Sequence, residues 1–145
     1  MSENHNLANL AIFSAVVPAG ASGDVVVTYD AAIPSNPTLY RIASYSLYSL
    51  ASPTPVAVGN DVTPESNAFS VALNVTGPAG IVIAGALLGG SNNASWTGAA
   101  LNIDEVTLGT TASAQNLTTE APRTITVQAS GTMASDALLV AASWA

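Results

Sequence analysis

The chain has 145 residues, of which 49% are hydrophobic and only 8% are charged, and its formal net charge is −7. Its two arginines and complete lack of lysine argue against binding to nucleic acid or to an anionic membrane, because both ligands attract basic side chains. The absence of cysteine excludes disulfides, thiol nucleophiles and cysteine-based zinc sites.

Short β-strands separated by Gly, Pro and Asn are expected along the whole chain. Val, Ile, Thr, Ala and Ser dominate, and turn residues recur at the spacing typical of an all-β sandwich or barrel. The length fits one domain. We therefore predict an antiparallel β-sandwich, of jelly-roll or immunoglobulin-like type, over residues 9–145, preceded by an N-terminal arm at residues 1–8. The expected strands are 9–17, 24–30, 38–50, 67–75, 80–89, 101–109, 111–119, 123–130 and 136–145.

The first three strands differ in regularity. The apolar alternation within 38–50 changes phase at Ala43–Ser44, which predicts a β-bulge there. A loop is expected at 32–37, because its two prolines lack an N–H and restrain the residues before them.

The middle of the chain carries the clearest patterns. Residues 67–75 alternate apolar and polar side chains, as a half-buried strand does, and residues 80–89 are apolar on both faces, as a central strand is. The polar stretch GGSNNASWTG (89–98) contains the residues that tight turns need. We interpret it as a hairpin connection from which Trp96 re-enters the sheet and packs inward.

Few charges protect the expected sheet edges. Soluble monomers usually guard such edges with lysine, other charges or proline. We therefore expect contacts between copies of the chain, in a homo-oligomer. The candidate interface comprises Tyr40, Arg41, Tyr45 and Tyr48. Tyrosine is enriched at interfaces, and Arg41 would either pair with an acidic residue across the interface or extend to solvent. Core packing with the hydroxyl at the surface is an equal alternative for the tyrosines.

No constellation of residues predicts catalysis. The only histidine, His5, lies in the expected arm, and a nucleophilic triad needs a base beside its nucleophile. Asp104 and Glu105 are adjacent and would point to opposite faces of a strand, so a solvated strand end is favoured over a calcium site. Arg123 starts a strand and is expected to be solvated. We predict no enzyme activity, metal or cofactor.

Several stretches resemble a group of small β-rich virion proteins of tailed bacteriophages and their prophage relatives. They are VVVTYD, an aromatic-containing strand followed by SPTPV, FSVALNVTGPAGIVIAGALLGG, SWTG and the C-terminal ALLVAASWA, and the likeness runs from about residue 24 to the end. These relatives usually carry an acidic Asp-Tyr-Asp-like stretch after SWTG, where this chain has ALNIDEV. A function that depends on this acidic stretch in the virion proteins is therefore not expected for this chain.

The resemblance implies a non-enzymatic virion structural protein, most simply a capsid decoration or head-attached protein. Its partners would be other virion proteins, above all the major capsid protein, and it would be assembled in the host cytoplasm. The N-terminus fits this origin, because Glu3 and the lack of basic residues are unlike a signal peptide. The alternative is a receptor- or carbohydrate-binding module of a tail fibre, with Asn92, Asn93 and Trp96 as its binding loop.

Overall fold

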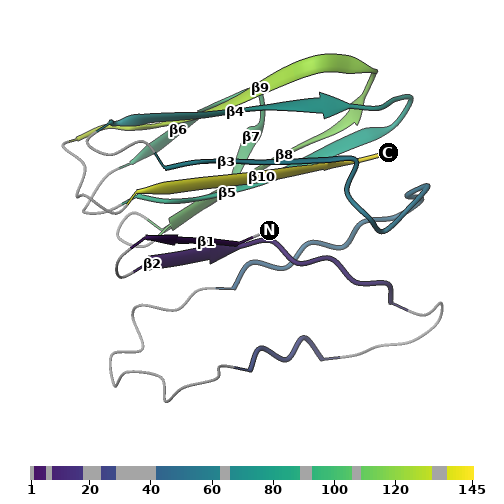
Figure 1. Cartoon of the computed structure of the whole chain (residues 1–145), viewed down its shortest axis with the longest axis horizontal. Coiled ribbons are helices and arrows are strands. Elements are labelled where there is room, and N and C mark those ends of the chain that lie inside the picture. Colours follow the sequence, from purple (N-terminus) through teal and green to yellow (C-terminus); the bar gives the residue numbers. More distant parts are fainter. Residues whose placement is uncertain are drawn as a thin grey trace.

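The computed structural model is an antiparallel β-sandwich, which confirms the predicted fold class (Figure 1). It describes residues 2–5, 8–17, 24–28, 42–62, 66–88, 93–105, 109–131 and 137–145. These residues contain strands, turns and extended segments, and among them no helix is long and apolar enough to cross a bilayer.

The larger sheet has five strands in the order β3-β10-β5-β8-β7. Their bounds are Ala57–Asp61 for β3, Leu138–Trp144 for β10, Gly80–Leu87 for β5, Gly109–Leu117 for β8 and Ala100–Glu105 for β7. All seven residues of β10 are buried, and β5 is nearly as deeply buried. These two strands therefore have cover on both faces, which was predicted for residues 80–89 and not for the C-terminal strand.

The smaller sheet has three strands in the order β4-β9-β6. They span Ala68–Val75 for β4, Glu120–Ala129 for β9 and Ala94–Thr97 for β6. Burial in β4 alternates strictly, so its Phe, Val and Leu side chains face the larger sheet and its Ser, Ala and Asn side chains face outward. The core between the sheets includes Phe69, Val71, Leu73, Val82, Ala84, Ile125, Val127 and Leu139.

The outer face of the larger sheet is covered by the chain that precedes β3. Strands β1 (Ser2–His5) and β2 (Ala8–Ala11) pair as an antiparallel hairpin and lie against β10 and β5. A second apolar cluster joins Ile83, Ala142 and Trp144 to residues that include Ile12, Tyr45, Leu47 and Leu50.

Residues 51–56, here called the strap, run along the C-terminal end of β10 and are hydrogen-bonded to it. The Ala51 amide donates to the Ala145 carbonyl at 2.8 Å, and the Val56 amide donates to the Ser143 carbonyl at 2.7 Å. The Trp144 indole Nε1 also donates to the Pro53 carbonyl at 3.1 Å. The apolar cluster on this face is therefore closed by hydrogen bonds as well as by packing.

Gly59 sets how closely β3 approaches the smaller sheet. A Cβ atom at this position would lie 2.3 Å from Val71 Cγ1, a separation that packed atoms do not reach. The absence of a side chain at Gly59 lets the edge of the larger sheet close over β4.

The strands predicted after residue 66 are confirmed, with ends that shift by a few residues. They correspond to β4, β5, β7, β8, β9 and β10. Strand β3 was not predicted, because its five residues AVGND are short and contain a glycine. The arm expected at 1–8 contains β1, which pairs with residues 8–11; its separate role stays a prediction.

Of the three strands predicted before residue 51, the first is confirmed only at its start and the other two are wrong for the described residues. The strand expected at 9–17 ends at Ala11, and residues 24–28 and 42–50 form no strand, so the bulge expected at Ala43–Ser44 is absent as well. Residues 29–41 lie outside the described residues. Residues 24–28 and 42–50 form no strand because no neighbouring strand pairs with them. A high β-propensity shows that the side chains suit a sheet, but it does not show that a partner strand is present.

The packing of Trp144 gives a first prediction. Trp144→Ala should lower the free energy of unfolding by about 3–5 kcal/mol, because it empties the centre of the outer-face cluster. Trp144→Phe keeps an aromatic ring but removes the hydrogen bond to the Pro53 carbonyl. It should therefore lower the free energy of unfolding by about 1 kcal/mol. Urea unfolding at a fixed protein concentration measures both. Equal losses for the two variants would contradict the packing described for this residue.

Candidate functional site

The polar loop that follows β5 leads into strand β6. The predicted hairpin connection is wrong, because β5 belongs to the larger sheet and β6 pairs with β9 in the smaller one. Trp96 is half-buried and packs against the main core. Its Nε1 donates to Thr110 Oγ1 at 3.0 Å, and the Thr110 hydroxyl donates to the Ile103 carbonyl at 2.9 Å. The indole N–H is therefore used in a hydrogen-bond chain that joins the two sheets.

The two asparagines of this loop are described only in part. Asn93 is exposed, and its backbone exchanges hydrogen bonds with Ser130 at the end of β9. Asn92 lies outside the described residues. Ligand binding by this loop stays a prediction.

The residues of the predicted tyrosine interface have different environments. Tyr40 and Arg41 lie outside the described residues. The ring of Tyr45 is half-buried in the outer-face cluster, and its hydroxyl hydrogen-bonds to Thr111 Oγ1 and donates to Asn102 Oδ1 at 3.2 Å. Tyr48 is 80% exposed. Tyr45 therefore holds its segment to β7 and β8, while Tyr48 remains available for contact.

Arg123 is not solvated as predicted. Its side chain is 23% exposed, and Nη1 donates to both carboxylate oxygens of Glu120 at 2.9 Å. Its Nε donates to the Gly98 carbonyl at 2.7 Å. Gly98 has a φ of +83°, and a Cβ there would lie 2.2 Å from the Thr124 carbonyl oxygen. The arginine therefore binds β9 to the turn after β6.

The described residues hold no group of three or more His, Asp or Glu side chains close enough to bind a metal. Asp104 and Glu105 lie on β7, whose six residues are all exposed. Every buried side-chain nitrogen or oxygen in the described part of the chain has a hydrogen-bond partner. The buried polar side-chain atoms of the described residues are therefore all satisfied within the chain.

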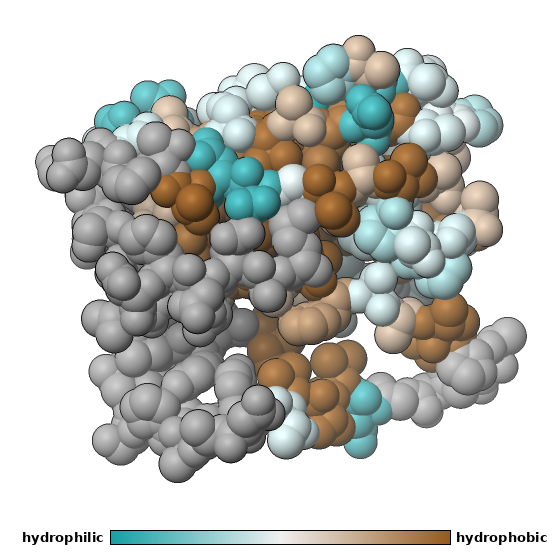
Figure 2. All heavy atoms as spheres, in the orientation of Figure 1, coloured by the Kyte–Doolittle hydropathy of each residue, from teal (hydrophilic) through white to brown (hydrophobic). Residues whose placement is uncertain are grey.

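Exposed apolar side chains gather in the N-terminal segment, here defined as residues 12–56. Phe13 is 87% exposed and Val26 is 78% exposed. Among the described residues of this segment, the exposed large hydrophobic ones are Phe13, Val16, Val17, Val25, Val26, Val27, Ile42, Tyr48 and Val56. In Figure 2, brown hydrophobic atoms accordingly appear on the part of the chain that lies below the sandwich.

Residues 13–17 and 24–28 join no sheet. They consist largely of β-branched or aromatic residues, which favour strands, yet no strand pairing includes them. Ser14 Oγ donates to the Pro53 carbonyl at 3.1 Å and so ties the first of these stretches to the strap. Valines on both sides of the backbone at 25–27 therefore face solvent.

Large apolar side chains that gather on an exposed segment often mark a site of interaction with another chain. Each valine side chain that is fully buried on association contributes about 1.5–3 kcal/mol. The edge strand β7 adds Leu101 at 46% and Ile103 at 43% exposure. The N-terminal segment is therefore the candidate interaction surface. Sequence reasoning missed it because VVV in 24–30 has the same pattern as a buried strand.

Comparison of the chain with protein-family models, curated proteins and solved structures gives no match.

The hydrogen-bond chain from Trp96 gives a second prediction. Trp96→Phe and Thr110→Val should each lower the free energy of unfolding by about 1–2 kcal/mol, since each removes a partly buried hydrogen bond. The double variant should lose less free energy of unfolding than the sum of the two single losses, because both substitutions remove the same hydrogen bond between Trp96 and Thr110. Chemical denaturation of the four proteins measures the coupling. Losses that add to within about 0.5 kcal/mol would show that the two side chains do not interact.

Proposed function

We propose that this chain is a non-enzymatic structural subunit that uses its N-terminal segment to bind neighbouring chains in a larger particle. The observation that carries the proposal is residues 24–28, an exposed stretch with strand-forming side chains and no sheet to join. Such a stretch gains both backbone hydrogen bonds and apolar burial when it adds to a sheet edge on another chain.

The sandwich offers edges that suit this mode of binding. Strand β7 forms one edge of the larger sheet, and both Leu101 and Ile103 on it are partly exposed. Strand β3 forms the other edge, where Val58 is half-exposed. Association through several such weak contacts per subunit becomes strong in a lattice, because each contact raises the effective concentration of the next.

The particle that we propose is a bacteriophage virion, with the chain decorating the capsid or attached to the head. Support for this comes from the resemblance of the stretches between residue 24 and the C-terminus to virion proteins. In a virion, the partners of the chain are the major capsid protein and other copies of the chain itself. Assembly takes place in the host cytoplasm.

Sedimentation velocity tests self-association. The native chain should sediment as oligomers whose size grows with concentration, because the exposed valines bind other copies. Combined Val25→Ser, Val26→Ser and Val27→Ser should shift it toward the monomer, since the change removes apolar area and leaves the sandwich intact. The matched control is Val25→Ile, Val26→Ile and Val27→Ile, which should keep the oligomers. A native chain that stays monomeric at high concentration would overturn self-association.

Particle fractionation tests the virion role separately. Phage particles purified from a producing host should contain the chain, and the serine variant should be depleted from them relative to the isoleucine control. Mass spectrometry of gradient-purified particles measures both amounts. Recovery of the native chain only from the soluble fraction would reject the virion role and would leave self-association untouched.

A further inference from the structure

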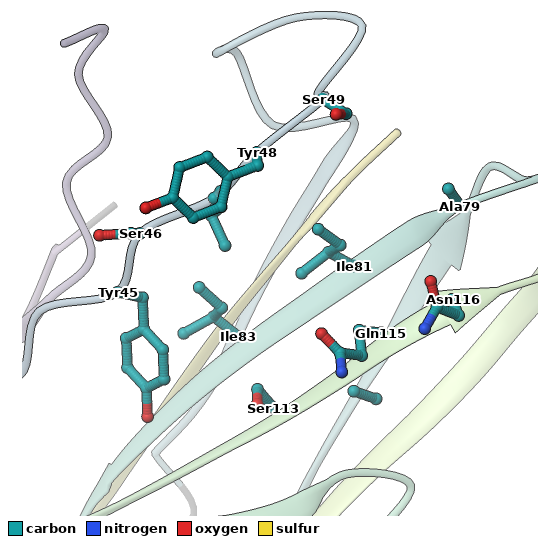
Figure 3. A pocket seen from close by; sticks show the side chains of 12 residues that line it. Tyr45, Ser46, Tyr48, Ser49, Ala79, Ile81, Ile83, Ser113, Gln115 and Asn116 are labelled. Atoms are coloured by element: carbon teal, nitrogen blue, oxygen red, sulfur yellow. The ribbon is translucent and has the colours of Figure 1, made fainter. Parts of the chain in front are cut away.

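A hollow of about 380 Å³ lies between residues 45–49 and the outer face of β5 and β8 (Figure 3). Its size falls within the range of small-molecule sites in proteins. Ile81 and Ile83 form an apolar floor, while Tyr48 and Ser49 contribute to the wall formed by the N-terminal segment. This hollow is separate from the exposed valines at 25–27.

A β-bulge shapes the wall on the β8 side. Gly80 is paired with Leu117 and Val82 with Ala114, so a two-residue step on β5 is matched by a three-residue step on β8. Ile81 is therefore opposed by both Gln115 and Asn116. A bulge of this kind re-aims side chains. Both amides line the hollow, as Figure 3 shows.

The backbone is unusual at two points around this hollow. Asn116 has a φ of 56°, and Ser49, on the facing wall, has a φ of 59°. They are the non-glycine residues with positive φ in the described part of the chain, and both line the same hollow. Conformations of this type have a free-energy cost for residues with a Cβ and gather at ligand sites.

The wall formed by the N-terminal segment is held in place. Leu47 and Leu50 pack into the outer-face cluster, and the Tyr45 hydroxyl hydrogen-bonds to Thr111 on β8. Beyond Leu50, the Ala51 amide is bound to the Ala145 carbonyl. Both walls are thus positioned before any ligand enters, which reduces the entropy lost on binding.

The lining side chains limit the class of ligand. None of the twelve described residues that line the hollow is charged, and the whole chain has a net charge of −7. An anion would find no arginine and a cation no carboxylate. An aliphatic ligand would leave the amides of Gln115 and Asn116 without partners on burial. Amides and hydroxyls that can both donate and accept match a ligand with many neutral hydroxyl groups.

The geometry points to a binding site for a neutral saccharide in this hollow. The Gln115 and Asn116 amides would hydrogen-bond to ring hydroxyls, while Ser49 and Ser113 lie near enough to add further partners. Tyr48, which is 80% exposed, would present its ring to the apolar C–H face of the sugar. The inference does not rest on the proposed role in assembly.

Ligand-observed NMR against a panel of sugars tests this site. The panel contains glucose, galactose, mannose and N-acetylglucosamine as monosaccharides, the corresponding β-linked or α-linked oligosaccharides, and the same oligosaccharides immobilised on a surface. At least one neutral sugar should bind with a dissociation constant of about 1 mM or tighter. Binding of the free sugars indicates a soluble ligand, whereas binding that needs the immobilised oligosaccharides indicates a cell-surface glycan.

Three substitutions probe the site and two serve as controls. Gln115→Ala and Tyr48→Ala should each weaken binding about tenfold, the effect of losing a hydrogen bond or a ring contact. Asn116→Gly removes the amide and keeps a residue that adopts positive φ readily, so it should weaken binding without unfolding the chain. The controls are Gln128→Ala and Phe13→Ala, an exposed amide and an exposed aromatic ring outside the lining of the hollow.

Two results would overturn the proposal. One is the absence of binding for every neutral sugar in the panel by a chain whose unfolding curve is native. The other is binding that the controls weaken as much as the three site variants do. Monomeric serine variants of residues 25–27 should still bind the sugar, so failure of the assembly proposal and failure of this one are distinguishable.

Discussion

Burial of β10 on both of its faces is the constraint from which the rest of the structure follows. Leu139 and Ala141 face the smaller sheet, while Ala142 and Trp144 face the opposite way. A strand with apolar side chains on both faces needs other residues to cover both faces. If one face stayed in water, the fold would lose the favourable free energy of burying its side chains. Three strands supply one cover, and the chain before β3 supplies the other.

The second cover is not a sheet, and this difference creates both surface features. In the described part of the chain, a hairpin, the strap at 51–56 and extended stretches lie over β10 and β5, and among them only the hairpin forms a strand ladder. The stretches that lie against the sheet bury Ile12, Tyr45 and Leu47 in part, whereas the valines at 25–27 remain exposed on both sides of the backbone. The covering stretches also leave a gap over Ile81 and Ile83, where a continuous layer would fill the space.

The sequence predicted the sandwich well and its cover poorly. The alternation of Phe69, Val71 and Leu73 and the uniform apolarity of 80–89 specify which faces are buried, so β4 and β5 were predictable. Residues 24–28 carry the same signal, yet periodicity cannot say whether the partner strand lies in the same chain. The hollow could not be predicted either, because the bulge at Gln115 and Asn116 depends on the register between β5 and β8.

The hollow and the exposed valines are separate features, but both involve the N-terminal segment, so that an event at one should influence the other. Residues 45–49 line the hollow, and they belong to the same N-terminal segment that carries the exposed valines. A ligand that bridges Tyr48 and Gln115 would hold this segment against β8, whereas a neighbouring chain that draws the segment away would open the hollow. Because such coupling is reciprocal, any change in saccharide affinity on assembly must equal the change in assembly on saccharide binding. The described residues of this segment are held to the sandwich by apolar packing and by single hydrogen bonds such as those of Tyr45, Ala51 and Val56, and a segment held in this way opens at a lower free-energy cost than a core strand does.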